Sequence, residues 1–252
     1  MNIEEKILTL VKYANPDDPV DYTNNIIKDY ACDKLNSQIY NCKACAIANL
    51  GLKSFGYGNP HSDILIITQP LNYNDYNYYM ENGIDITMPY NDYQGNILNQ
   101  YMKIINANVE YPYYIRGINC CPADIKNGQV IGRYPDMSEI QNCRNNFINR
   151  FIKLFNPKII ICLGSTASNI MVTQNGNNAM PLTKMHGQLF NYCGYPVMPT
   201  FSPDDLSNGN KYIEKAILKE CEQDFLKDLY NAFSYVKNIN PNCEIGDIHL
   251  NF

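Results

Sequence analysis

Four of the ten cysteines have a spacing that could hold a metal. Cys42 and Cys45 form a C-x-x-C pair just after a predicted helix, and that spacing alone is compatible with zinc, a redox dithiol or chance. Cys120 at the end of a predicted strand and Cys143 in the first turns of the next predicted helix strengthen the case for metal ligation. We expect simple burial for Cys162, which lies inside the apolar run IIICLG, and for the other isolated cysteines.

Composition indicates a reducing compartment for these thiols. The N-terminal residues MNIEEKILTL lack the basic and apolar regions of a secretion signal. No apolar run reaches the roughly 18 residues of a membrane span. Ten cysteines in such a chain argue against a disulfide framework, because the cytosol keeps thiols reduced. We therefore expect a cytoplasmic monomer without membrane contact.

The charge balance limits how the chain could bind a nucleic acid. A formal charge of −5 gives no sign of a general polyanion binder, so DNA binding would depend on a local basic face. Scattered solvated charges are the alternative reading of the same residues. The candidates for a basic face are Lys43, Lys126, Arg133, Arg144 and Lys184.

The apolar pattern predicts strands that alternate with helices. Short runs such as ILIIT and IIICL are typical of buried parallel strands. Strands are predicted over 64–68, 113–119, 159–163 and 197–201, and helices over 3–13, 22–40, 97–105, 138–155, from 165, and over 211–236. The order indicates a three-layer α/β/α fold around a central four-stranded parallel sheet. Residues 1–40 would form an N-terminal helical extension, and residues 41–252 a domain that includes the C-terminal helix.

Five segments, taken in order, carry a family resemblance. They are GLKSFGYGNPHSDILIITQPLNYND, MPYNDYQGNIL, CCPADIKNGQVIGRYPDMSEIQNC, NPKIIICLG and PVMPTFSPDDL. They resemble V-F-G-x-G…ILFIGEAPGxxED, G-P-F-V-G-x-A-G-x-L-L, C-R-P-P…N-R-x-P…E-(I/V)-x-x-C, P-K-V-I-V-x-L-G and P-V-x-x-T-(Y/F)-H-P-x-x-L of the iron–sulfur (family 4) uracil-DNA glycosylases. The resemblance implies a uracil-DNA-glycosylase-like fold and DNA as the partner.

The resemblance also implies a structural 4Fe–4S cluster that staples the fold. Such a cluster takes four thiolates, and a zinc site on the same residues is the alternative. Cys121 is a rival for Cys120 but stands where the family has an arginine. Extra residues around 126–131 would lie near the DNA face. The implied ligands are Cys42, Cys45, Cys120 and Cys143.

The active-site positions depart from the family pattern. The GEAPG motif reads ITQPL here, so a carboxylate has become Thr68, followed by Gln69. The asparagine that reads uracil has become Arg116, and the histidine of H-P-x-x-L has become Ser202. The aromatic residue that stacks on the flipped base is kept in kind as Tyr90.

These replacements change the expected substrate. Excision needs a flipped base, a stabilised leaving anion and a managed water or cation. Arginine only donates hydrogen bonds, so Arg116 would suit a base with an acceptor at N3, as in cytosine. Thr68 in place of glutamate leaves space for a bulky substituent. A modified, cytosine-like pyrimidine is therefore a better expected substrate than uracil.

Other side chains could supply the missing charge or contact the substrate. Asp204 and Asp205 follow the Ser202-Pro203 turn and are the favoured catalytic carboxylates, with Ser202 beside them. His186 falls on the family's basic-residue–Gly pair and could touch phosphate or the leaving base. Each aspartate has a plain alternative as a solvated turn residue, and His186 as a loop residue. The remaining carboxylate candidates are Asp75 and Asp92.

Three functions follow from these residues. The first is a DNA glycosylase of changed base specificity, which would fit defence against phage DNA that carries modified bases. The second is a member without catalysis, which serves as a DNA-binding or replication-accessory scaffold. The third is another enzyme class on this fold, such as a base-exchange transglycosylase.

Overall fold

The computed structural model describes residues 25–49, 53–70, 81, 93–105, 113–118, 120–173, 179–206, 215–243, 245 and 248. The predicted helix over 3–13 lies outside these ranges. The strands are β1 (Gly56–Gly58), β2 (Ile64–Thr68), β3 (Tyr114–Gly117), β4 (Ala123–Lys126), β5 (Gln129–Gly132), β6 (Ile159–Leu163), β7 (Phe190–Tyr192) and β8 (Tyr195–Thr200). The helices are α2 (Asn25–Tyr40), α3 (Ala46–Asn49), α5 (Tyr93–Ile105), α6 (Met137–Cys143), η1 (Arg144–Ile148), α7 (Asn149–Phe155), α8 (Ser165–Thr173), η2 (Leu182–Lys184), α9 (Pro203–Leu206) and α10 (Lys215–Ile239).

The main sheet has six strands in the order β1-β3-β2-β6-β8-β7. Strands β3, β2, β6 and β8 are parallel, whereas β1 and β7 pair antiparallel at the edges. The predicted four-stranded parallel sheet is thus the centre of a larger mixed sheet. The two edge strands have three residues each, which is too short for the apolar alternation that reveals a strand.

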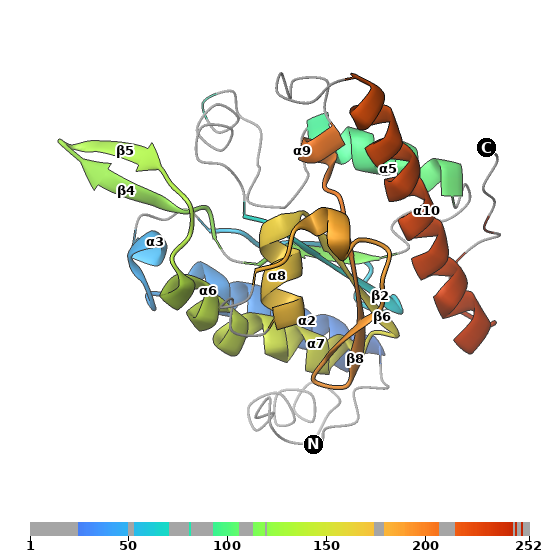
Figure 1. The fold of residues 1–252 in the computed structure, drawn as a ribbon. Helices are drawn as coiled ribbons and strands as arrows, with labels where there is room; N and C mark the ends of the chain where they lie inside the picture. The colour runs from blue at the N-terminus through green and yellow to red at the C-terminus, as the bar shows by residue number, and fades with distance from the viewer. Residues whose placement is uncertain are drawn as a thin grey trace, which may run out of the picture.

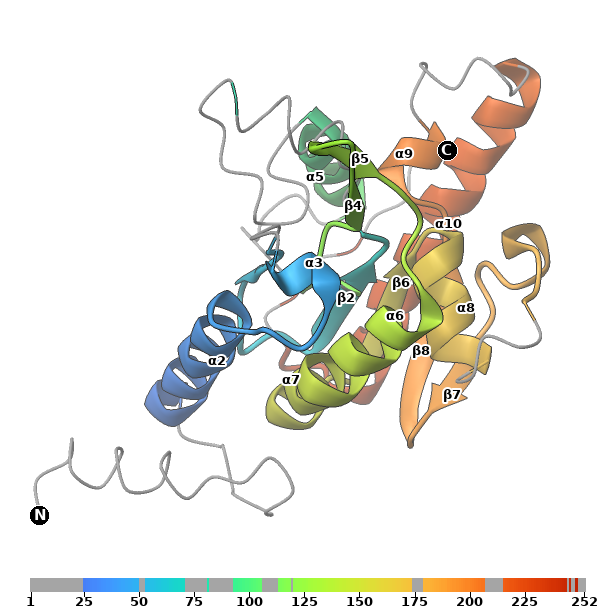
Figure 2. The same ribbon diagram turned by 90° about the vertical axis from the view of Figure 1, so that its left-hand side faces the viewer.

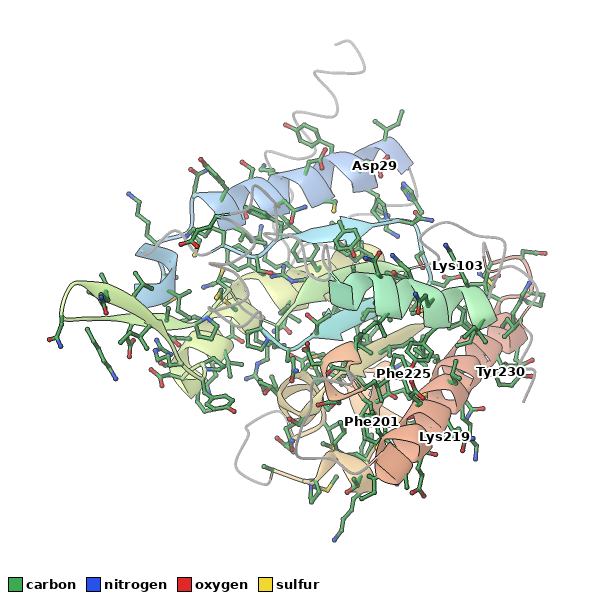
Figure 3. All side chains as sticks on the ribbon, turned by 90° about the horizontal axis from the view of Figure 1, so that it is seen from above. Asp29, Lys103, Phe201, Lys219, Phe225 and Tyr230 are labelled. Carbon is green, nitrogen blue, oxygen red and sulfur yellow. The ribbon has the colours of Figure 1, made fainter. Side chains whose placement is uncertain are left out.

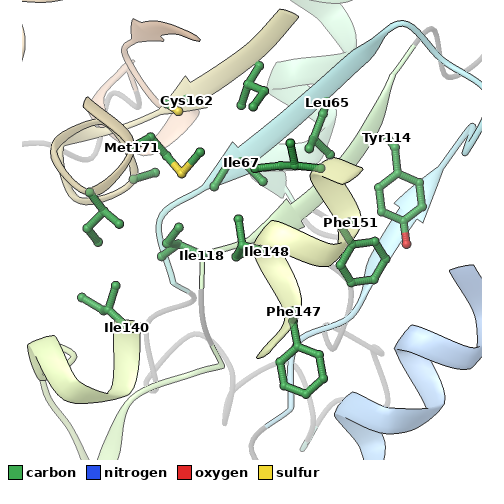
Figure 4. Packing of buried hydrophobic residues seen from close by; sticks show 14 of the residues in the cluster. Leu65, Ile67, Tyr114, Ile118, Ile140, Phe147, Ile148, Phe151, Cys162 and Met171 are labelled. Atoms are coloured by element: carbon green, nitrogen blue, oxygen red, sulfur yellow. The ribbon is translucent and has the colours of Figure 1, made fainter. Parts of the chain in front are cut away.

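Helices cover both faces of the sheet and form three layers (Figures 1 and 2). In β2, Leu65 and Ile67 join one core with side chains of α2, α7 and α8, while Ile64 and Ile66 join a second core with side chains of α5 and α10. This alternation is the period of a strand that is buried on both faces. Figure 4 shows the first core, and Figure 3 shows Phe201 and Phe225, both members of the second core, near α10.

Helix α2 belongs to the first core. Its Cys32, Leu35 and Ile39 are buried there, and the helix packs against α7. The boundary at residue 40 between an extension and a domain stays a prediction.

Helices α6 and α7 form one continuous rod with a π-turn between them. The five residues of η1 keep right-handed helical backbone on both sides, and the Asn149 N–H donates to the Arg144 carbonyl five residues back. The rod ends at Asn156 in the left-handed conformation with φ of 46°, just before Pro157, as the Asn-Pro pair predicts. Cys143 therefore precedes the π-turn, and Phe147 and Phe151 lie within and after it.

Strands β4 and β5 form a separate hairpin that projects from the body of the protein (Figure 1). Asn127 and Gly128 at its tip have φ of 52° and 77°, the backbone that a tight two-residue hairpin turn requires. The extra residues expected near 126–131 form the end of this hairpin. Ile125 and Ile131 on its strands are exposed.

Within the described ranges, no helix is both long and apolar enough to cross a membrane.

Candidate functional site

The carboxyl ends of the four parallel strands lie side by side. Thr68 in β2 pairs with Gly117 in β3 and Leu163 in β6, and Leu163 pairs with Thr200 in β8. Backbone hydrogen bonds continue one residue further, from Gln69 N–H to the Leu163 carbonyl at 3.2 Å. Ligands of open α/β sheets bind beyond the carboxyl ends of the strands, so this edge is the place where a substrate site is expected.

Gln69 joins two other predicted site residues at this edge. Its Nε2 donates to Ser202 Oγ at 3.4 Å and to Asp204 Oδ2 at 3.2 Å. These bonds link residues 133 and 135 positions apart in the sequence. The structure therefore brings three of the predicted site residues, Gln69, Ser202 and Asp204, into one polar group.

Gly164 makes room for the Gln69 amide. It has φ of 85°, and a Cβ built on it would meet Gln69 Oε1 at 2.6 Å. A side chain at position 164 would thus push the amide out of place and would also strain the backbone. This glycine ends β6 and opens the turn into α8, which explains why the sequence has glycine there.

The Asp205 carboxylate forms hydrogen bonds within the turn that begins α9. Its Oδ2 accepts from the Ser202 N–H at 2.9 Å and from Ser202 Oγ at 2.8 Å. The Ser202 hydroxyl in turn accepts from the Asp205 N–H at 3.3 Å. Ser202 is fully buried, so this reciprocal cap fixes the loop that carries Asp204.

Thr68 lies buried at the end of β2, and its Oγ1 donates to the Gln69 carbonyl at 2.9 Å. The hydroxyl is therefore used locally, at the position where the resembled family has a carboxylate. Tyr90, Asp75 and Asp92 fall outside the described residues.

His186 lies in a separate group against α10. Its Nδ1 is 3.1 Å from Asp228 Oδ2, its Nε2 is 3.8 Å from Asp224, and its ring lies 5.0 Å from that of Phe201. Asp228 also accepts from Thr200 Oγ1 at 2.8 Å. Burial raises the pKa of Asp228, although the bonds from Thr200 and His186 act in the opposite direction. Sequence reasoning missed Asp228, because nothing in an amphipathic helix marks one aspartate as buried.

The four predicted ligand cysteines are present as thiols. Cys120 and Cys143 are hydrogen-bonded and buried, and Cys42 and Cys45 pack against the core that contains Cys120. Burial is the largest influence on Cys45 and raises its pKa, and the charges of Cys120 and Cys42 act in the same direction. In the described ranges, no three His, Cys, Asp or Glu side chains converge tightly enough to form a metal-binding group.

Arg116 packs on the α7 side of the sheet, where Cys143 and Cys120 are among the groups whose charges act on it. The side chain is 1 % exposed, its Nε donates to the Gly117 carbonyl at 3.1 Å, and its Cζ lies 4.7 Å from the centre of the Phe151 ring. Tyr114, two residues earlier in β3, packs on the same side against Phe151 at 5.9 Å between ring centres. The geometry thus separates Arg116 from the side chains with which the sequence grouped it.

Arg133 holds the base of the β4–β5 hairpin. It donates to Asp124 Oδ1 at 2.7 Å and to Glu139 Oε2 at 2.8 Å, and Glu139 also accepts from the Asp136 N–H at 2.9 Å. The hydrogen bonds from Arg133 and Asp136 lower the pKa of Glu139, although burial alone, the largest single influence, would raise it. Among the basic-face candidates, Arg133 is therefore committed to carboxylates within the chain.

The fold and the polar group at the strand ends define an α/β protein of the type that binds ligands at the carboxyl edge of its sheet. Residues 55–229 match the uracil DNA glycosylase superfamily. The chain is also 24 % identical over 202 residues to the Type-4 uracil-DNA glycosylase of Sulfurisphaera tokodaii, an alignment that covers 77 % of this chain and 82 % of that protein.

The chain belongs to the uracil DNA glycosylase superfamily. This membership confirms the class of enzyme that the sequence predicted, a DNA glycosylase that hydrolyses N-glycosidic bonds.

Proposed function

We propose that the protein excises a modified pyrimidine from DNA at the carboxyl edge of β2, β6 and β8. The observation that carries the proposal is the hydrogen-bonded group of Gln69, Ser202 and Asp204 at that edge. It combines an amide and a carboxylate, which are groups that can read a base and manage charge at the sugar.

Asp204 is the proposed catalytic carboxylate of this group. Cleavage of the bond between base and sugar gives a transient sugar cation and a base anion, and water then adds to C1′ and gives up a proton. A carboxylate stabilises the cation and orients the water. The Gln69 amide fixes the orientation of Asp204, whereas Asp205 holds the turn and Ser202 caps it.

Substrate preference follows from two replacements. Thr68 lacks the carboxylate of the resembled family and donates its hydroxyl to the backbone, and Ser202 replaces a larger histidine. Smaller side chains at both positions support a base with an extra substituent. The cytosine-like preference inferred for Arg116 loses its support, because that guanidinium packs on Phe151. We keep Tyr90 as the proposed stacking residue, Asp75 as a catalytic candidate, Asp92 as a substrate-binding carboxylate, and His186 as a contact to phosphate or the leaving base.

A 4Fe–4S cluster is proposed for Cys42, Cys45, Cys120 and Cys143. Four thiols are the donor set that such a cluster takes, and these four cysteines would hold it. When bound, it would supply structural cross-linking of the loop after α2 to the start of the α6–α7 rod.

Excision of modified bases would suit the handling of phage DNA.

Base release from defined oligonucleotides tests the proposed activity. The panel carries uracil, hypoxanthine, hydroxymethylcytosine and glucosylated hydroxymethylcytosine, and we expect release of a substituted pyrimidine. Asp204→Asn should lower the release rate by about 100-fold or more. Glu220→Gln, a change of an exposed carboxylate on α10, should leave the rate unchanged.

A DNA-binding scaffold without catalysis is the second candidate. It is favoured by the use of Asp205 within its own turn and by the absence of the family's carboxylate at Thr68. Absence of base release from every oligonucleotide, by folded protein that binds DNA, would contradict the enzyme proposal and support the scaffold.

A further inference from the structure

Arg116 is a buried cation whose charge is not balanced by a carboxylate contact in the described part of the chain. Its contacts are the Gly117 carbonyl and the face of the Phe151 ring. Its Nη1 is buried and has no hydrogen-bond partner among the described residues. Burying a charge costs several kcal/mol unless partners compensate it, so an orphaned guanidinium nitrogen indicates a missing anion.

Two other arginines of the described structure differ from Arg116 in exposure and contacts. Arg133 bonds to the carboxylates of Asp124 and Glu139 and is partly exposed. Arg150 also has a buried Nε without a hydrogen bond to the described residues, but its Nη1 donates to the side-chain oxygen of Gln38 at 2.6 Å and the residue is only half-buried. Arg116 is therefore the arginine whose surroundings need explanation.

A second buried cation contacts the segment that carries Cys42. Lys53 is 7 % exposed, and its Nζ donates to the carbonyls of Cys42 at 2.6 Å and of Ala48 at 2.8 Å. Arg116 and Lys53 are thus two buried cations whose charges act on the Cys120 sulfur.

We infer that Arg116 is the buried counter-charge of an anionic metal–thiolate group held by Cys42, Cys45, Cys120 and Cys143, and that its Nη1 supplies a hydrogen-bond donor to that group. The inference rests on the proposed cluster and assigns a role to a residue of this chain. Four thiolates around an iron–sulfur core leave a net negative charge, and hydrogen bonds and charge near the sulfurs set cluster stability.

The stacking on Phe151 explains how Arg116 is held for this role. The ring lies on the α6–α7 rod that also carries Cys143, so one element positions both the ligand and the support of its counter-charge. The carbonyl of Gly117 fixes the guanidinium from the strand side. Arg116 is thus a positioning residue for the cofactor and contacts neither substrate nor reacting atoms.

Iron and acid-labile sulfide per chain, and the rate of iron release to a chelator, test the inference. Wild-type protein purified without oxygen should contain both elements. Arg116→Met should release iron about 10- to 100-fold faster, the usual effect of removing an outer partner of a metal site. Arg116→Lys should release iron at a rate between those of wild type and Arg116→Met. Arg150→Gln, a control on the rod that carries Cys143, should release iron at the wild-type rate.

Thermal unfolding of the metal-free proteins separates this role from simple packing. Without the metal group the guanidinium is an uncompensated buried charge, so Arg116→Met should unfold at the same temperature as wild type or higher. A residue that only packs would destabilise the metal-free and loaded proteins alike, and that result would overturn the inference.

The outcomes distinguish this inference from the proposal beneath it. Wild-type protein without iron and sulfide would remove the cluster, and the inference with it. A wild-type cluster that Arg116→Met retains at the wild-type rate would overturn the inference alone. Neither readout uses base release, so the proposed excision is judged separately.

Discussion

Asp228 and Arg116 are charged side chains buried on opposite faces of the sheet, and their surroundings differ. Asp228, 3 % exposed on the α10 side, accepts a hydrogen bond from Thr200 and lies 3.1 Å from the His186 ring nitrogen. Arg116, 1 % exposed on the α7 side, has a carbonyl, an aromatic ring and an orphaned nitrogen. The chain itself compensates the first charge, whereas the inferred metal–thiolate group would compensate the second.

The difference indicates which buried charge serves the fold and which serves a cofactor. A buried carboxylate with a hydroxyl and an imidazole beside it is a closed hydrogen-bond network that ties α10 to β8. A buried guanidinium without an anion is complete only when the cysteines carry negative charge. Stability measurements on the metal-free protein can therefore tell the two faces apart.

The largest loss of stability is expected on the α10 side of the sheet, where Asp228 is buried. Asp228→Ala should lower the free energy of unfolding by about 3 kcal/mol, because it leaves Thr200 and His186 without their buried partner. Urea unfolding of the metal-free protein measures this value. Asp224→Ala, which removes a partly exposed carboxylate 3.8 Å from the same histidine, should change it by less than about 0.5 kcal/mol. Equal losses in the two variants would contradict the closed network.

A smaller loss of stability is expected from changing Phe151, the ring beneath the Arg116 guanidinium. Phe151→Leu should cost the metal-free protein about 2 kcal/mol, from lost core packing and from the lost attraction between ring and cation. In the Arg116→Met background the same change should cost less, since the cation is then absent. A double-mutant cycle by urea unfolding gives the difference, and a coupling of zero would show that the ring only fills space.

The smallest effect concerns the carboxylate at the base of the hairpin. Glu139→Gln should lower stability at neutral pH by about 1.5 kcal/mol, through weaker bonds to Arg133 and Asp136. The folded pKa of Glu139 lies below its ordinary value of 4.5. Its stabilisation is therefore complete above pH 4.5 and is lost as the pH falls through the lower folded pKa.

Unfolding free energies of wild type and Glu139→Gln across this acid range test whether the Glu139 contribution to stability falls with pH. The two curves should approach each other as the pH falls. Asp136→Asn is the control, since that carboxylate is 72 % exposed and 3.8 Å from Arg133. A difference that grows in acid would contradict the assignment.

The parts of the fold that could be predicted are those with a strong local signal. Strands β2 and β6 were predicted over their observed residues, because five consecutive apolar residues have few other uses in an α/β chain. The β4–β5 hairpin was expected only as extra residues near the DNA face. Its strands have four residues each, although the Asn127-Gly128 pair is a hairpin signal that could have revealed it.

The candidate site was predictable in position and less so in orientation. Gln69, Ser202 and Asp204 follow strands whose parallel ends had to lie side by side, and they do meet. The direction of Arg116 could not be inferred, because β3 is buried on both faces and its apolar residues do not tell one face from the other. The partners of His186 come from α10, 38 and 42 residues further along the chain.

The π-turn in the α6–α7 rod sets the direction of the Cys143 side chain relative to Phe151, the ring beneath Arg116. Each helical residue advances about 100° around the axis, so the extra residue of a π-turn rotates everything before it by that amount relative to everything after. Deleting one residue from 144–148 would restore regular winding and swing Cys143 about a quarter-turn or more away from Cys120 while Phe151 stayed under Arg116. The one additional residue of the π-turn thus sets the relative orientation of Cys143 and Phe151, which lie about two helical turns apart.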